Sequence, residues 1–302
     1  MDQLSRLEEF EIERIGVTTL CSQLWCEVQT ELNLRYGRER TAVMISGGER
    51  HRELHEEIAE IIPVKTETKA DNTAILFQNM ITSTRQLLKQ GLTRELPVIG
   101  QIPPLKIIGQ IDELVLKDDA VYIRDYKTRL NPTLPSYPQQ RCEETQLMFY
   151  HKLLTDIVDE EFTIDDALAI FDINRDDTIS SELYTTMTEK GLELHSPNVS
   201  ETGELAFSLL TRLPSISDKF TITYEHQETK NRIGIHEFMF NSKGFTRDIN
   251  FILEYWKGER DAIPVGEKNR WKCNFCEHTS RCPVWAPTNK MKEHSSKQQM
   301  KQ

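Results

Sequence analysis

Apolar residues recur along the chain with two periods, one typical of helices and one typical of strands. Stripes at helical spacing predict helices at 17–36, 49–61, 72–89, 140–158 and 246–256. Alternating or continuous apolar runs predict strands at 62–68, 96–102, 105–116, 120–123, 220–226 and 233–240. The segment 163–214 is acidic and weakly patterned, so its secondary structure is not predicted.

The two apolar runs at 105–116 and 120–123 form the pattern of a β-hairpin. They flank the polar pair Asp118 and Asp119, which is the length of a tight two-residue turn. Neither turn residue is glycine, so the turn type stays open.

Counting back from this turn in antiparallel register predicts which residues face each other. Asp112 falls opposite Asp125, and Gln110 falls opposite Lys127. Because side chains alternate between faces with a period of two, Asp125 and Lys127 share one face of their strand. The hairpin is therefore expected to bring two carboxylates and one ammonium group together.

Two carboxylates facing each other on a half-buried sheet repel, and a divalent cation would remove that penalty. Hard oxygen ligands suit Mg²⁺ or Mn²⁺, and a nearby lysine can orient a water or stabilise charge on a phosphate. The hairpin thus outlines a phosphodiesterase site. An exposed hairpin with polar ends explains the same residues about equally well.

Composition places the chain among soluble globular proteins. Its 302 residues are 38% hydrophobic and 28% charged, enough for a sizeable core in one large or two modest domains. No run approaches the length of a membrane span, and none resembles a secretory signal. The first residues are rich in glutamate, unlike a mitochondrial presequence. Nucleus or cytosol is the expected compartment, with the mitochondrion as the alternative.

The formal net charge of −11 argues against indiscriminate nucleic-acid binding, but the charge is unevenly placed. The segment 143–204 is strongly acidic, whereas bases outnumber acids after residue 205. A local basic groove is compatible with this distribution. The basic tail at 286–302 is expected to be disordered and solvated.

Two helices carry pairs of polar side chains one turn apart. His51 and His55 share a face of the predicted helix 49–61, a spacing that can bind metal, although the surrounding glutamates favour a solvated surface, particularly for His55. Gln146 and Tyr150 are adjacent in the same way on the helix 140–158.

Six cysteines in a chain with no export signal suggest metal ligation or free thiols before disulfides. Cys273, Cys276 and Cys282 crowd into one short stretch, for which metal binding is the better interpretation. The fourth ligand stays open. His278 would complete a zinc site, whereas a distant cysteine would favour an iron–sulfur cluster. Cys142 is expected to be a small core residue.

Taken in order, these motifs resemble a known family. GQIDEL, then DYK, then a helix with Gln146-x-x-x-Tyr150 resembles the RecB-like branch of the PD-(D/E)XK nucleases. Gly47-x-x-x-His51 is similar to the helical histidine motif of that branch, although the residue before the histidine is polar. With Trp25-Cys26-Glu27 and the C-terminal Cys-x-x-Cys-x5-Cys-Pro, the chain resembles the exonuclease V family of iron–sulfur single-strand DNA exonucleases.

The resemblance implies an α/β fold with a PD-(D/E)XK restriction-endonuclease-like core, in which helices flank a mixed central sheet. It implies a single nuclease domain over 17–285, after a lead at 1–16 and before the basic tail. The acidic segment 162–216 would be an insert of unknown role.

The resemblance also implies a set of site residues. Asp112 and Asp125 would ligate Mg²⁺ or Mn²⁺, and His51 would add a ligand or shape the site. Lys127 would position water and stabilise phosphate charge. Gln146 and Tyr150, on the helix, would support these residues.

Four cysteines would hold a structural [4Fe–4S] cluster that ties the two ends of the chain together. They are Cys26, Cys273, Cys276 and Cys282, which leaves Cys21 and Cys142 structural. The implied substrate is single-stranded DNA, attacked with a 5′-end preference by a monomer in DNA repair or genome maintenance. A single-strand binding protein is a candidate partner, and no membrane is involved.

Two other functions fit parts of the pattern. One is a non-catalytic binding module stabilised by zinc through Cys273, Cys276, His278 and Cys282. The other is a RecB-like nuclease that acts with a helicase or CRISPR partner, which shares the same motifs. The absence of helicase motifs in this chain favours the free-standing exonuclease.

Overall fold

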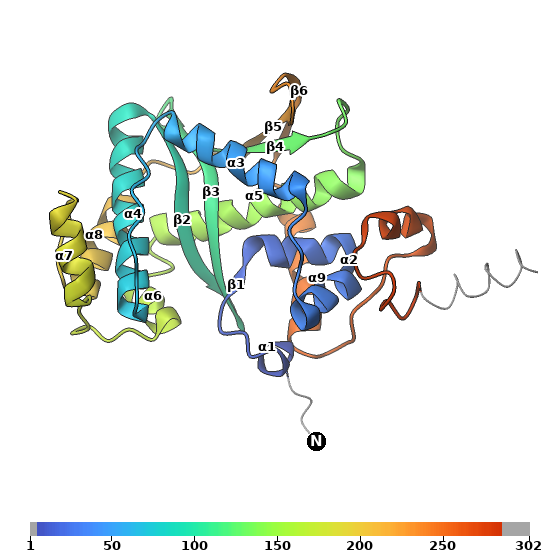
Figure 1. The fold of residues 1–302 in the computed structure, drawn as a ribbon, viewed down its shortest axis with the longest axis horizontal. Coiled ribbons are helices and arrows are strands. Elements are labelled where there is room, and N and C mark those ends of the chain that lie inside the picture. Colours follow the sequence, from blue (N-terminus) through green and yellow to red (C-terminus); the bar gives the residue numbers. More distant parts are fainter. Residues whose placement is uncertain (1–4, 286–302) are drawn as a thin grey trace, which may run out of the picture.

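The computed structural model describes residues 5–285, which form one mixed sheet with helices packed around it (Figure 1). The helices are α1 (Arg6–Glu9), α2 (Val17–Tyr36), α3 (Ala42–Glu56), α4 (Lys69–Gln90), α5 (Tyr137–Val158), α6 (Ile164–Phe171), α7 (Ser181–Glu189), α8 (Val199–Leu210), α9 (Ser242–Trp256) and the 3₁₀ helix η1 (Glu267–Phe275). The strands are β1 (Ile15–Gly16), β2 (Leu92–Ile102), β3 (Leu105–Lys117), β4 (Ala120–Arg129), β5 (Lys219–His226) and β6 (Arg232–Met239).

The sheet forks along β3. Its strand order is β1-β3-β4-β5-β6, and β2 pairs with β3 outside this path. Near the turn, β3 pairs antiparallel with β4, and this ladder ends at the pair Glu113 and Arg124. Further along, β3 instead pairs in parallel with β1 at Ile107 and Ile108, while β4 pairs in parallel with β5 from Arg124 onward. The fork opens a space in the sheet just beyond Glu113.

The predicted hairpin is confirmed at its turn. Lys117 pairs with Ala120, and the two turn residues have φ of 51° and 58°, the left-handed conformation that tight hairpin turns require. The predicted pairing of Gln110 with Lys127 is wrong, because the fork separates the strands before that point. Gln110 instead donates a hydrogen bond from Nε2 to the carbonyl oxygen of Glu95 on β2 (3.3 Å).

The helix α5 lies directly against the sheet and passes behind β2 and β3 in Figure 1. Glycines permit this close approach. A Cβ at Gly109 would lie 2.7 Å from Tyr150 Cε1, and one at Gly100 would lie 2.5 Å from Leu153 Cδ2. The glycine of GQIDEL is therefore the position that lets α5 reach the strand carrying Asp112.

The acidic segment left unassigned by the sequence folds as α6, α7 and α8, which stack beside α4 (Figure 1). The ring of Phe77 on α4 packs edge-on against Phe171 and Phe207, with centroids 6.5 and 6.3 Å apart. A Cβ at Gly203 would meet Phe77 Cε2 at 2.8 Å. The segment therefore shares the apolar core of the sheet domain.

Two predicted elements differ from the structure. The helix carrying His51 begins at Ala42, capped by the Thr41 hydroxyl, so Gly47 and Gly48 lie inside it rather than at its start. The predicted strand 62–68 is an unpaired connection. Its alternate residues are partly buried, which explains the period of two, but no neighbouring strand supplies a ladder.

The N-terminal helices α1 and α2 pack against α9, and the segment after α9 continues beside α2 (Figure 1). Buried polar contacts join them. Trp256 Nε1 donates to Gln23 Oε1 (2.7 Å), and Arg260 reaches both carboxylate oxygens of Glu27 (2.5 and 2.9 Å). The predicted basic tail at 286–302 lies outside the described residues. No helix within residues 5–285 is both long enough and apolar enough to cross a membrane.

Candidate active site

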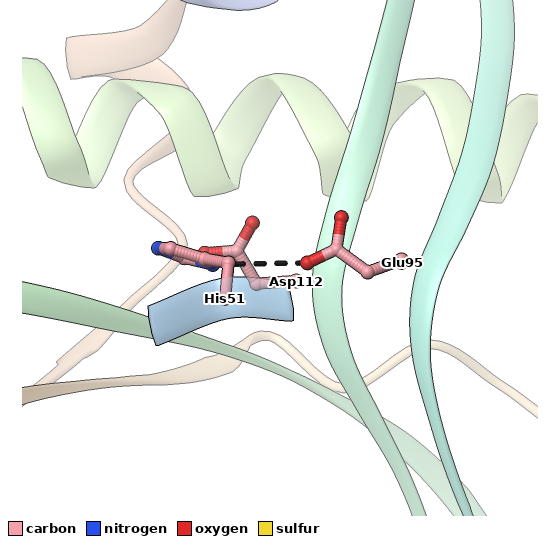
Figure 2. Close-up of side chains that lie close together, drawn as sticks. All are labelled: His51, Glu95 and Asp112. Carbon is pink, nitrogen blue, oxygen red and sulfur yellow. Dashed lines mark ion pairs between the residues drawn. The ribbon is translucent and has the colours of Figure 1, made fainter. Parts of the chain in front are cut away.

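Three possible metal ligands converge at the fork of the sheet. His51 comes from α3, Glu95 from β2 and Asp112 from β3, and their side chains point toward one another (Figure 2). One ligand atom from each lies within 4.8 Å of the others. His51 Nδ1 is 3.5 Å from Asp112 Oδ2 and 3.7 Å from Glu95 Oε1. The structure thus brings together two predicted residues and one that sequence reasoning missed.

Glu95 reaches this cluster because its backbone departs from regular strand geometry. Its φ is 58°, and the β2–β3 ladder skips it between the pairs Arg94–Glu113 and Leu96–Ile111. A non-glycine residue in this conformation costs about 1–3 kcal/mol and tends to occur at functional sites. The available signal was an acid inside an apolar strand, but linking it to Asp112 requires the β2–β3 register.

Asp125 and Lys127 form the other half of the site. Asp125 is 2% exposed, and its Oδ2 is 2.7 Å from Lys127 Nζ. Burial opposes ionisation of Asp125, but the nearby Lys127 ammonium outweighs it and lowers the pKa of Asp125. Burial alone would lower the pKa of Lys127, but the carboxylates of Asp125 and Asp112 raise it above its ordinary value.

Asp112 is the carboxylate whose ionisation this arrangement disfavours most strongly. Burial, and then repulsion from Asp125, raise its pKa well above the usual range of an aspartate. Within residues 5–285, Asp112 Oδ2 and Asp125 Oδ1 are buried without a hydrogen-bond partner. Unsatisfied buried carboxylate oxygens are costly, and a cation bound beside them would offset that cost. Oxygen donors plus one imidazole are a donor set that Mg²⁺ or Mn²⁺ accepts.

The helix α5 adds the two remaining predicted residues. Gln146 Oε1 accepts from Lys127 Nζ (3.3 Å), and Gln146 Nε2 donates to the Tyr150 hydroxyl (2.9 Å). Tyr150 is 4% exposed, and burial raises the pKa of its hydroxyl. The chain from Asp125 through Lys127 and Gln146 to Tyr150 is therefore continuous. All six predicted site residues meet around the fork.

The four predicted cluster ligands line one pocket at the meeting point of the two chain ends. Cys26 projects from a break in α2, where its φ of −166° and ψ of 111° interrupt the helix. Cys273, Cys276 and Cys282 approach from the C-terminal segment. Burial raises the pKa of the thiols of Cys26, Cys273 and Cys276. Two bases, Arg270 and Lys272, also line this pocket.

The spacing of these thiols does not match a compact zinc site. In the described part of the chain, no three cysteine sulfurs lie within 4.8 Å of one another. Tetrahedral Zn–S bonds of about 2.3 Å would bring the sulfurs to about 3.8 Å apart. His278 does not line the pocket, and its Nε2 instead lies 2.8 Å from Asn33 Oδ1 on α2. His278 therefore contacts α2 rather than the pocket in this structure.

Buried carboxylates, a histidine and a lysine at one fork are groups suited to phosphodiester hydrolysis. Among protein-family models, that of "Exonuclease V - a 5' deoxyribonuclease" matches residues 2–120, 115–208 and 200–285. The protein is therefore an enzyme of the deoxyribonuclease class, a hydrolase that acts on DNA. Because the match spans nearly the whole chain, the chain belongs to the exonuclease V family.

Two exonuclease V sequences and one solved structure are similar to parts or most of this chain. Exonuclease V of Danio rerio is 28% identical over 290 residues, which cover 93% of this chain and 73% of the relative. Exonuclease V, mitochondrial, of Candida dubliniensis is 26% identical over 70 residues, which cover 23% of this chain and 11% of that protein. The crystal structure of SSO0001 aligns over 92% of both chains with a TM-score of 0.39 and 12% identity.

Proposed function

We propose that this protein is a metal-dependent exonuclease that degrades single-stranded DNA, with a preference for 5′ ends, on a PD-(D/E)XK core. The observation that carries the metal dependence is the pair of buried, unpartnered carboxylate oxygens on Asp112 and Asp125 beside Lys127. Folding places these charges at a cost, which a bound cation would offset.

Four residues would hold the cation: Asp112 and Asp125 as predicted, His51 as predicted, and Glu95 as an addition. When bound, Mg²⁺ or Mn²⁺ would neutralise charge on the scissile phosphate and make a water more acidic. Asp125 and Asp112 differ in role before binding. The Lys127 ammonium outweighs burial and lowers the pKa of Asp125, whereas burial and the Asp125 carboxylate raise the pKa of Asp112.

The remaining residues orient the reacting groups. The Lys127 ammonium would add positive charge where the phosphate gains negative charge during attack, and would hold the attacking water by hydrogen bonding. Gln146 fixes the position of Lys127 through the 3.3 Å contact, and Tyr150 fixes Gln146 in turn. Both helical residues are therefore positioning residues for the lysine.

A groove leads from Gln146 toward the chain ends and suits a single strand. Its lining includes the bases Arg38 and Arg129, which would attract phosphates. It also includes a run of aromatic rings on which bases could stack: Trp25, Trp271 and Phe275. Trp271 lies edge-on to Trp25 with centroids 5.5 Å apart, and Phe275 is 76% exposed.

The four pocket cysteines would hold a [4Fe–4S] cluster with a structural role. Their origin from α2 and from the segment after α9 supports this, because one cluster would join two parts of the chain that are far apart in the sequence. Arg270 and Lys272 would balance the negative charge of four thiolates. Lys272 is held in place by a hydrogen bond to the Trp25 carbonyl oxygen (3.1 Å) and by its position over the Trp25 ring (4.3 Å).

The deciding experiment combines metal content with cleavage on one anaerobically purified sample. A broad brown absorption band with about four irons per chain is expected, together with Mg²⁺-dependent degradation of single-stranded DNA and little degradation of the duplex. Substrates labelled or blocked at either end would test the 5′ preference. A colourless protein with one zinc and no cleavage would overturn the proposal and favour a zinc-stabilised binding module.

The biological setting stays part of the proposal. We propose a role in DNA repair or genome maintenance, in which a single-strand binding protein would present the substrate to a monomeric enzyme. The name of the Candida relative adds the mitochondrion to the nucleus and cytosol as a compartment to examine by localisation of the tagged chain.

A further inference from the structure

A second groove borders the cluster of possible metal ligands at the fork. It includes His51 and Glu95 in its lining and runs between α3, α4 and the helical segment that follows α6. The groove that contains Gln146 is built from α2, α5 and η1, and the two share no lining residue. A strand whose scissile phosphate lies at the fork therefore has two separate grooves near the cleaved bond.

We propose that this second groove binds the nucleotides beyond the scissile bond, and that it sets the length of the oligonucleotide released in each cut. The inference rests on the proposed exonuclease function. It names a binding site for product-side DNA on α4, whose residues the catalytic mechanism does not use.

The wall formed by α4 is chemically suited to base edges. Amide and hydroxyl side chains line it at helical spacing: Gln78, Asn79, Thr82 and Ser83. Gln78 is 9% exposed, and its Oε1 is buried without a hydrogen-bond partner among the described residues. A buried acceptor of this kind calls for a donor, which the exocyclic amino groups of bases supply. Amides both donate and accept, so this wall would tolerate any base.

The charges of the second groove favour weaker binding than those of the first. Arg52 and Arg85 are opposed by Glu60, Glu95 and Glu193, all in its lining. In the first groove, by contrast, Glu143 is the one acid facing Arg38 and Arg129, and the Tyr224 hydroxyl donates to its carboxylate (2.6 Å). Weak attraction of phosphates beyond the cut would let product leave while the uncut strand stays bound.

The acidic helical segment also lines the second groove. Met187, Leu192 and Glu193 are in its lining, and Glu193 Oε2 lies 3.5 Å from Arg85 Nη1 on α4. This gives the segment a role that its sequence did not suggest. It limits how far product-side nucleotides extend from the fork.

The test is the length distribution of products from a uniform single strand, measured by mass spectrometry under Mg²⁺. Asn79→Trp places a large ring in the groove from an exposed position on α4. Products shorter by at least one nucleotide are expected. Lys89→Trp is the matched control, because Lys89 is exposed on the same helix but outside the groove, and it should leave the distribution unchanged.

A second measurement does not depend on turnover. In the Asp125→Ala protein, 5-iodouracil placed at successive positions of a bound strand would be photocrosslinked and the linked peptides identified. Positions on one side of the fork should link to the peptide containing Trp271, and positions on the other side to peptides containing Met187 or His55.

The outcomes separate the two proposals. If the unmodified protein fails to cut single strands with Mg²⁺, the proposed function is wrong. If it cuts, but Asn79→Trp gives the same product lengths and all crosslinks fall in the first groove, the function stands and the product-side groove is wrong. An inactive or unfolded Asn79→Trp leaves the decision to the crosslinks.

Discussion

The fork of the sheet and the cysteine pocket both gather charged or reactive groups, but the surrounding protein supports them differently. The fork lies among strands whose apolar residues are almost fully buried, such as Ile111, Ile123 and Leu114. The cysteine pocket lies in a segment without a core of its own. Among the described residues, no apolar side chain after Trp256 belongs to the buried core.

The difference implies opposite relations between each site and the fold. At the fork, the folded core holds unfavourable charges in place, so the site depends on the fold. At the pocket, the described residues after Trp256 add no apolar side chain to the buried core, so the fold there would depend on the cluster, as in small domains stabilised by metal. Changes at the fork should affect catalysis, and changes at the pocket should affect stability.

The largest effect is expected from Cys276→Ser. Loss of one thiolate should prevent cluster assembly and release the segment after α9, giving little soluble protein. Iron content and hydrogen exchange of residues 257–285 would measure this. The control Cys142→Ser removes a thiol that lies outside the pocket, whose pKa burial raises to about 11, and it should retain iron. A folded, iron-free and active Cys276→Ser protein would show that the fold of the segment after α9 does not depend on the cluster.

Next in size is Asp125→Ala. Removing this carboxylate should lower the cleavage rate by about 10³-fold or more, because the cation loses a ligand and Lys127 loses its partner. The brown absorption band should be unchanged. Single-turnover cleavage assays and visible spectra on the same sample would check both expectations. Full activity would show that the site assignment is wrong.

Arg260→Ala tests whether the ion pair between Arg260 and Glu27 holds the cysteine pocket in its folded shape before the cluster binds. It would leave the carboxylate of Glu27, whose side chain is 1% exposed, without its partner next to Cys26. Breaking a buried pair in this way costs about 3–5 kcal/mol. A lower midpoint of urea unfolding and slower cluster reconstitution are expected. Asp261→Asn is the control, since this acid pairs with Arg6 but is 93% exposed. Equal stability of the two variants would show that this ion pair does not hold the pocket in shape.

The smallest effect is expected from Glu95→Gln. The amide keeps the shape of the side chain but weakens the hold on the cation, so the Mg²⁺ concentration for half-maximal cleavage should rise by about 10–100-fold. Activity at saturating Mg²⁺ should largely recover. An unchanged Mg²⁺ dependence would show that Glu95 is not a ligand. As a control, Glu113→Gln alters a neighbouring strand acid that pairs with Arg94 instead (3.0 Å).

Local pattern was sufficient for much of the fold. The hairpin turn follows from two polar residues between apolar runs, and α4, α5 and the β5–β6 pair follow from periodicity. The segment 162–216 was not predictable, because its helices are short and its apolar residues are meaningful only against Phe77 on α4. The unpaired connection at 62–68 shows the reverse error. Alternation reports which side chains are buried, while a strand also needs a neighbour.

By itself, the sequence determined the kinds of groups present and their order: the carboxylates and lysine of the hairpin, the polar pair on α5, and the cysteines at both ends. Only the tertiary structure decided which of them meet. Glu95 lies in the site because β2 pairs with β3 and the backbone of β2 is irregular at this residue. His278 lies outside the cysteine pocket, where its Nε2 contacts Asn33 Oδ1 on α2. The physical reason is that spacing along the chain determines local geometry, whereas contacts between distant elements depend on how the whole core packs.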